Sequence, residues 1–233
     1  MAMTAAPAHR YPCLDGLRLI AATLVVLTHA AFLTGNYGET GAGRMFARLD
    51  VAVALFFALS GFLLSLPLFR AAAEGRPRPR TAAYLWRRAL RVLPAYWVAV
   101  AMALLFTPGE HEITLADWLR HLVLGQIYGY GWLREGLTHT WSLCTEVAFY
   151  VLLPFVVAGL VRLSGKDRWR PGRVLAGIAA LMVVGLGWLT WSEADESISA
   201  PLNLWLPAYA TWFGAGLAVA VLVATGPEWR PTR

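Results

Sequence analysis

Long apolar runs separated by short polar segments make up most of the sequence. Each run approaches the roughly 20 residues that a helix needs to cross about 30 Å of hydrocarbon. Helices are expected because every backbone amide inside a bilayer must find its hydrogen-bond partner within the segment. The pattern therefore predicts an all-α fold, a polytopic transmembrane helix bundle with about six spans: Leu14–Thr34, Leu49–Phe69, Leu90–Phe106, Thr140–Val161, Val174–Trp191 and Leu204–Ala224.

One further stretch has helical spacing without continuous apolar character. In Leu115–Tyr130 the apolar positions are interrupted by Asp117, Arg120 and His121. This pattern predicts an amphipathic helix on the outer surface or packed over the bundle. Between the second and third spans, residues 76–80 alternate Arg and Pro, which predicts an extended linker.

Composition and charge agree with a membrane protein. Hydrophobic residues make up 58% of the chain and charged residues only 15%, with a mean hydropathy of +0.54, whereas soluble domains carry about 25% charged residues. The net charge of +6 does not indicate nucleic-acid binding, because the basic residues lie in the segments between apolar runs. Their asymmetry predicts that both termini lie in the cytoplasm, and we expect the membrane to be the bacterial plasma membrane. Cys13 and Cys144 share no short spacing, so we expect neither a zinc site nor a disulfide framework.

Ionisable groups inside predicted spans are costly and often functional, and three stand out: Arg18, His29 and Glu146. Arg18 and His29 are eleven residues apart, which is three helical turns plus about 20°, so both face one side of the first helix, roughly 16 Å apart. Glu146 lies about 9 Å inside the outer end of the fourth span, a depth that matches His29. We predict a His–carboxylate pair suited to proton transfer. The alternatives are a polar contact for His29, and a lock between helices or a proton-relay element for Glu146.

Basic and small residues mark two further features. Arg88 and Arg91 are three residues apart near the cytoplasmic end of the third span, so they share a face and can grip phosphate. The alternative is that they only set topology or touch lipid headgroups. Ser60 and Gly61 lie mid-span, where small residues permit close helix approach; this role is favoured over a Ser60 nucleophile.

Four motifs in chain order carry a resemblance to the integral-membrane acyltransferase-3 family. They are Leu14-Asp15-Gly16-Leu17-Arg18 with His29 after ten residues, Phe56–Phe62, Arg87–Tyr96, and Trp141–Glu146 followed by Phe149-Tyr150. By this resemblance Arg18 and His29 correspond to the family's essential pair, Arg88 and Arg91 to its basic motif near the donor phosphates, and Glu146 to its acidic residue. The candidate pocket residues are Asp15, Ser60, Trp141 and Ser142.

The resemblance implies one membrane acyltransferase-like domain over residues 1–233, with the motifs in residues 14–150. Members of the family usually carry about ten spans, so six spans are expected to mark a fragment, a truncated gene product or a shortened member, without the C-terminal spans. The implied function is O-acyl transfer from a cytoplasmic acyl-CoA to a hydroxyl of a sugar, polysaccharide or small natural product. Acyl-CoA would be a co-substrate, and neither a cofactor nor a metal is expected.

The hypothesis assigns a role to each polar group. Arg18, Arg88 and Arg91 hold the donor phosphates, His29 takes the proton of the acceptor hydroxyl, and Glu146 orients His29 and stabilises its charged form. A transporter or flippase with Arg18, His29 and Glu146 along its pathway is the alternative, and an inactive truncated fragment is another. The sequence has no clear inverted repeat, which disfavours transport.

Overall fold

A computed structural model describes residues 12–38, 41–107, 112–163, 165, 169–194 and 201–226. Over these residues the secondary structure is helical, with no strand, which confirms the predicted fold class. The chain divides into two compact units that meet within one helix, the first ending at Leu59 and the second starting at Ser60. We describe each unit separately, and the single domain expected from the sequence stays a prediction.

Six helices among the described residues are long and apolar enough to cross a membrane, which confirms the six predicted spans. They cover Cys13–Leu33, Gly41–Ala73, Thr81–Phe106, Thr138–Leu163, Pro171–Ala194 and Leu206–Thr225. The third begins at Thr81, not Leu90, because residues 81–89 favour a helix even though they are too polar to count as a hydrocarbon span. Arg87 and Arg88 are therefore helical. The linker at residues 76–80 is free of helix, as predicted.

The first unit contains α1 (Pro12–Leu33), the short α2 (Gly41–Ala47), the 3-10 helix η1 (Arg48–Asp50) and the start of α3 (Val51–Ala73). Both α2 and η1 pack against α1. The buried hydroxyl of Thr28 on α1 donates a hydrogen bond to the carbonyl oxygen of Phe46 on α2, at 2.7 Å. This bond ties the hairpin after α1 back to the helix that carries His29.

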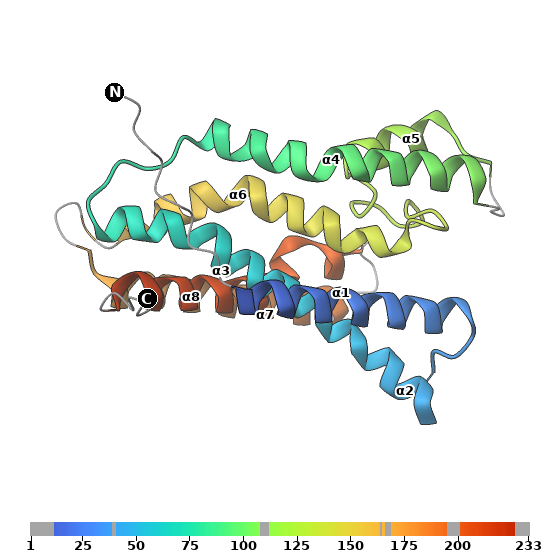
Figure 1. Ribbon diagram of the computed structural model, residues 1–233, viewed down its shortest axis with the longest axis horizontal. Helices are drawn as coiled ribbons and strands as arrows, with labels where there is room; N and C mark the ends of the chain where they lie inside the picture. Colours follow the sequence, from blue (N-terminus) through green and yellow to red (C-terminus); the bar gives the residue numbers. More distant parts are fainter. Residues whose placement is uncertain are drawn as a thin grey trace. The chain divides into compact units, whose positions relative to one another are not determined.

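The second unit holds the rest of α3 together with α4 (Thr81–Phe106), α5 (Leu115–Leu122), α6 (Trp141–Leu163), α7 (Pro171–Ala194) and α8 (Ala210–Thr225). In this unit α6 packs against α4 (Figure 1). It also packs against α7, which in turn packs along α8. A Cβ on Gly61 would lie 2.4 Å from the carbonyl oxygen of Phe213. The close approach predicted for Gly61 is thus present between α3 and α8, and the ring of Phe213 stacks on Phe149 of α6 at 4.0 Å.

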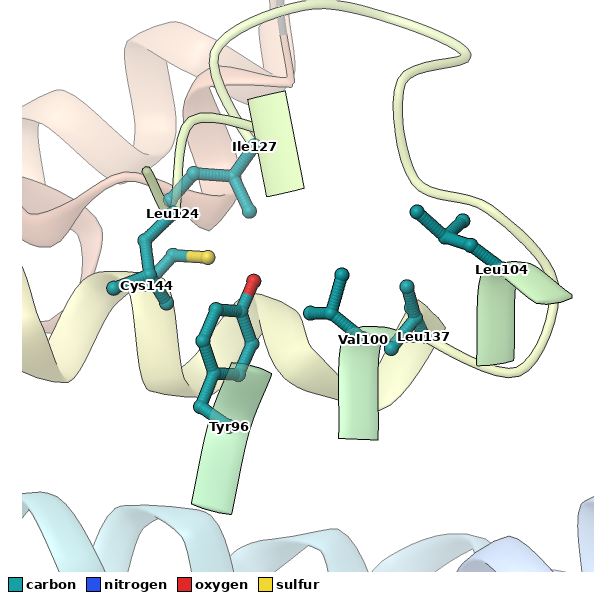
Figure 2. Close-up of a cluster of buried hydrophobic side chains, with 7 residues drawn as sticks. All are labelled: Tyr96, Val100, Leu104, Leu124, Ile127, Leu137 and Cys144. Carbon is teal, nitrogen blue, oxygen red and sulfur yellow. The ribbon is translucent and has the colours of Figure 1, made fainter. Parts of the chain in front are cut away.

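A buried apolar cluster joins α4, α6 and the segment after α5. Figure 2 shows its members, with the Tyr96 hydroxyl and the Cys144 sulfur both directed into it: Tyr96, Val100, Leu104, Leu124, Ile127, Leu137 and Cys144. The amphipathic helix predicted for Leu115–Tyr130 ends at Leu122. It stops there because Leu124 adopts a left-handed φ of 59° and the Gly125 amide bonds back to the carbonyl of Arg120 at 2.7 Å, the usual end of a Schellman-type turn.

Beside this cluster lies a buried polar network. Asp117 is fully buried and accepts hydrogen bonds from Thr114 and from Arg134, whose Nη2 lies 2.8 Å from its carboxylate. Burial alone would raise the pKa of Asp117, but these bonds outweigh burial and lower its pKa to about 2. The Tyr96 hydroxyl donates to the carbonyl of His121 at 2.7 Å and accepts from Gln126 at 3.0 Å. Tyr96 and Trp97 of α4 thus bond to backbone carbonyls at the end of α5, whereas the Asp117 side chain bonds to Thr114 before α5 and to Arg134 after it.

Candidate functional site

Glu146 lies in the second unit at a junction of α3 and α6. Its carboxylate accepts a hydrogen bond from the hydroxyl of Ser60, which is buried. The side chain of Tyr150, one turn along α6, is a further hydrogen-bonding partner of both Glu146 and Ser60. Two of the residues predicted for the site, Ser60 and Glu146, are thus in direct contact. Ser60 does more than permit close packing, because it supplies a polar partner that the carboxylate needs inside a membrane.

The basic motif of α4 reaches this junction through one residue. The guanidinium of Arg88 is half-buried and lies over the ring of Tyr150, 5.7 Å from its centroid. This distance is typical of a cation–π contact. Arg87 and Arg91 are exposed instead. Arg88 and Arg91 were predicted to share one face of the helix, but their side chains have different surroundings. Of these three arginines, Arg88 is the one that contacts Tyr150.

Tyr84 completes the junction. Its position one turn before Arg88 on α4 places both side chains on one face. Its hydroxyl is close enough to Arg88 and Glu146 to interact with the charge of each. The hydroxyl atom is buried, and within the described part of the chain it has no hydrogen-bond partner. We call the set Ser60, Tyr84, Arg88, Glu146 and Tyr150 the polar junction.

The first unit carries the other two ionisable residues, both on α1. Nδ1 of the half-buried His29 lies 2.7 Å from the carbonyl oxygen of Val25. Because a carbonyl can only accept, Nδ1 carries a proton, and in the neutral form of the ring Nε2 then holds the lone pair. Arg18 is partly exposed and forms an ion pair with Asp15 at 3.7 Å. The predicted pair of His29 and Glu146 has one member in each unit, and it stays a prediction.

The remaining candidate pocket residues have local partners. The Trp141 ring lies against Tyr209, with 5.2 Å between the centroids, and the Ser142 hydroxyl donates to the carbonyl of His139 at 3.2 Å. Both residues sit at the start of α6, within five positions of Glu146 in sequence. Within the described residues, no three His, Cys, Asp or Glu side chains gather closely enough to hold a metal ion.

Sequence reasoning did not single out Tyr84 or Tyr150 as site residues. A signal for both was present, since Tyr84 precedes Arg88 by four positions and Tyr150 follows Glu146 by four. Residues four apart on a helix are neighbours on its surface. Inspecting the positions one helical turn from Arg88 and from Glu146 would have identified Tyr84 and Tyr150. Only the contact of α3 with α6, which no local pattern predicts, shows that Ser60 belongs with them.

Comparison with known proteins agrees with the motifs. A family model described as an acyltransferase domain, Acyl_transf_3, matches residues 11–231. The chain is 28% identical to the acyltransferase MdmB of Streptomyces mycarofaciens over 95% of its own length and 59% of that protein. It is 25% identical to the O-acetyltransferase OatA of Staphylococcus aureus (strain NCTC 8325 / PS 47) over 76% of its own length and 28% of that protein.

These relatives are longer proteins, and the chain spans less than two thirds of the length of each. No solved structure matches the chain. The family model nevertheless covers nearly the whole sequence, and the six membrane-spanning helices agree with it. The chain is an integral membrane protein that belongs to the acyltransferase-3 family.

Proposed function

We propose that the chain is a membrane O-acyltransferase that moves an acyl group from a cytoplasmic acyl-CoA to a hydroxyl of a sugar, polysaccharide or small natural product. Its family membership and its likeness to proteins named acyltransferase and O-acetyltransferase support the reaction class. We further propose that it lies in a bacterial plasma membrane with both termini in the cytoplasm. The basic residues between the spans support this orientation.

The observation that carries the proposal is the contact of His29 Nδ1 with the carbonyl oxygen of Val25, at 2.7 Å. With Nδ1–H directed at the Val25 carbonyl, Nε2 is the nitrogen able to take a proton from an acceptor hydroxyl. A backbone carbonyl is a fixed partner, so the imidazole keeps one orientation along α1. An imidazole oriented in this way has the geometry required of a general base.

The reaction then needs one imidazole and no metal. Nε2 of His29 removes the hydroxyl proton while the acceptor oxygen bonds to the thioester carbon. The C–S bond breaks as the tetrahedral intermediate collapses, and the departing sulfur takes the proton from the imidazolium. The products are an oxygen ester and free CoA thiol. Glu146 is proposed to orient His29 and to stabilise the imidazolium, as a carboxylate does in a catalytic triad.

The donor is proposed to bind through its phosphates. Arg18, Arg88 and Arg91 supply guanidinium groups, which bind phosphate through charge-assisted hydrogen bonds. Arg18 and His29 are roughly 16 Å apart along α1, a length that suits an extended pantetheine-like arm between phosphate and thioester. The ion pair of Arg18 with Asp15 is partly exposed, and such pairs are weak enough to exchange for phosphate.

The test is acyl transfer by the purified protein in detergent. Acyl-CoA is supplied with a panel of sugar, polysaccharide and natural-product hydroxyls; released thiol is measured with a chromogenic reagent and the product by mass spectrometry. We expect transfer by the wild type and none by His29→Ala at equal expression. Thr23→Ala is the matched control on α1, since its exposed hydroxyl only caps the carbonyl of Leu19, and it should retain activity.

Two outcomes would overturn the proposal. Full activity of His29→Ala would show that His29 is not the general base. Failure of the wild type to consume acyl-CoA in detergent, together with movement of a solute across sealed vesicles, would favour the transporter alternative, because a transporter needs a closed compartment and an acyltransferase does not.

A further inference from the structure

The polar junction holds two hydrogen-bond donors on α4 that lack an acceptor. The hydroxyl of Tyr84 is buried and has no hydrogen-bond partner in the described part of the chain. One turn along, the half-buried guanidinium of Arg88 lies over the Tyr150 ring. It forms neither a hydrogen bond nor an ion pair with any of the described residues. Folded proteins leave few buried polar atoms unpaired, because each one is costly, so these two groups indicate that an acceptor binds beside them.

The carboxylate of the junction does not serve as that acceptor. Glu146 accepts a hydrogen bond from Ser60 and has Tyr150 as a further partner. Its charge is close enough to act on the Tyr84 hydroxyl, but no hydrogen bond joins the two groups. The capacity left open is therefore one neutral O–H and the N–H groups of a cation. A ligand with several acceptor oxygens and a negative charge satisfies both.

From this arrangement, and resting on the proposed acyl transfer, we infer that Tyr84 and Arg88 together bind a phosphate group of the acyl donor. The guanidinium supplies charge and N–H donors, and the Tyr84 hydroxyl donates to another oxygen of the same phosphate. Tyr150 is a positioning residue, because its ring holds Arg88 through the cation–π contact. Tyr84, Arg88 and Tyr150 all belong to the second unit.

The phenol and the guanidinium contribute differently to binding. A guanidinium attracts any nearby anion, including the headgroup of an anionic lipid. The phenol is rigid, so it bonds only to an oxygen that lies at hydrogen-bond distance from its hydroxyl. Loss of this hydroxyl leaves the charge of Arg88 in place and removes one hydrogen bond to a charged group, which is worth about tenfold or more in affinity.

The experiment measures binding and stability separately for wild type and Tyr84→Phe in detergent. Calorimetry with CoA should show the dissociation constant rising by about tenfold in the variant. Pantetheine, which has no phosphate, should bind both proteins equally. Without ligand, Tyr84→Phe should melt at the same temperature as wild type or higher, because it loses an unpaired buried hydroxyl. Weaker CoA binding without loss of stability separates a binding role from a structural one.

Tyr96→Phe is the matched control on the same helix. Its hydroxyl is also buried but is engaged with His121 and Gln126, so this variant should melt at a lower temperature and bind CoA as wild type does. An unchanged CoA dissociation constant in Tyr84→Phe, an equal loss of pantetheine binding, or a fall in the melting temperature without ligand would overturn the inference.

A lipid headgroup is the other source of phosphate, and nanodiscs separate it from CoA. Melting temperatures are compared in phosphatidylcholine with and without phosphatidylglycerol. We expect the same effect of phosphatidylglycerol on wild type and Tyr84→Phe. A smaller stabilisation of Tyr84→Phe by phosphatidylglycerol, with CoA binding unchanged, would assign the site to lipid and overturn the inference.

Failure of the inference differs from failure of the proposed function. A wild type that transfers acyl groups, with Tyr84→Phe binding CoA equally well, keeps the function and overturns the inference. A wild type that binds CoA through Tyr84 but transfers no acyl group to any acceptor keeps the phosphate site and overturns the function. A wild type that neither binds CoA nor transfers an acyl group overturns both.

Discussion

Ser60 of α3 donates a hydrogen bond to the carboxylate of Glu146 of α6, across 86 positions of sequence. The bond joins two membrane-spanning helices through one small hydroxyl and one acidic group. A carboxylate inside a bilayer is costly unless it is paired. Ser60 therefore lowers the cost of keeping Glu146 at this depth and fixes the direction in which its carboxylate faces.

The first prediction concerns this bond. Ser60→Ala should lower kcat/KM moderately and Glu146→Gln more strongly, because Ser60 acts through Glu146. The double variant should match Glu146→Gln alone, since residues that share one hydrogen bond are not additive. A double-mutant cycle on kcat/KM measures the coupling. Ser65→Ala is the control, because Ser65 is buried on the same helix but bonds only to the backbone of α3, the nearest contact being Gly61 at 2.6 Å.

Two results would contradict this reading. Additive losses would show that Ser60 and Glu146 act independently. Complete inactivity of Ser60→Ala, equal to that of His29→Ala, would instead support the serine nucleophile that the sequence left as an alternative.

The second prediction separates the arginines of α4. Arg88 is half-buried over Tyr150 while Arg87 and Arg91 are exposed. Arg88→Gln should raise the KM of acyl-CoA by about tenfold or more, the equivalent of one lost charged hydrogen bond. Arg91→Gln should raise it less, and Arg87→Gln should have no effect. Steady-state kinetics over a range of donor concentrations measures these differences.

A donor without the nucleotide phosphates provides the control for charge. With acyl-pantetheine, wild type and Arg88→Gln should show similar KM values, because the phosphates that Arg88 would grip are absent. A rise in KM that persists with acyl-pantetheine would show that Arg88 supports the junction structurally and does not bind phosphate.

Much of the fold could be predicted from the sequence, because the thickness of the hydrocarbon core fixes the number of apolar residues that a spanning helix needs. Runs of apolar residues have to cross the bilayer as helices, so all six spans are evident. The start of α4 was less evident, since residues 81–89 are helical but polar and only the end of the Arg-Pro linker marks their beginning. The length of α5 was also predicted wrongly, because the helix ends where Leu124 adopts a left-handed backbone conformation.

The site was predicted in part. Charged residues inside apolar runs are conspicuous, so Arg18, His29 and Glu146 could be chosen from the pattern alone. Uncharged partners such as Tyr84 are common in membrane helices, so a spacing of four residues from a charged residue does not single them out. Their role emerges only when tertiary structure shows which of them lie beside a charge and which hydroxyl is left without a partner.

The third prediction tests the contact between α3 and α8. Gly61→Ala would place a methyl group 2.4 Å from the carbonyl oxygen of Phe213, and backbone cannot move aside as a side chain can. We expect a loss of about 1–3 kcal/mol, as for other overpacked sites, seen as a lower melting temperature. Gly159→Ala on α6 is the control, because a Cβ there meets nothing within 4 Å; equal melting temperatures for the two variants would contradict the contact.

The last prediction concerns pH and the network under α5. His121 is fully buried, its Nδ1 lies 2.8 Å from the carbonyl oxygen of Asp117, and burial lowers its pKa from 6.5. Below about pH 6.5 the unfolded chain binds a proton that the folded chain resists, so folding stability is complete above that pH and is lost as the pH falls. Thermal melts from pH 7 to 5 should therefore fall less steeply in His121→Asn, which keeps a donor for Asp117 and does not titrate. Asp117 itself, with its pKa lowered to about 2, adds a separate loss only below about pH 4, so a slope between pH 7 and 5 that survives His121→Asn would show that another group controls it.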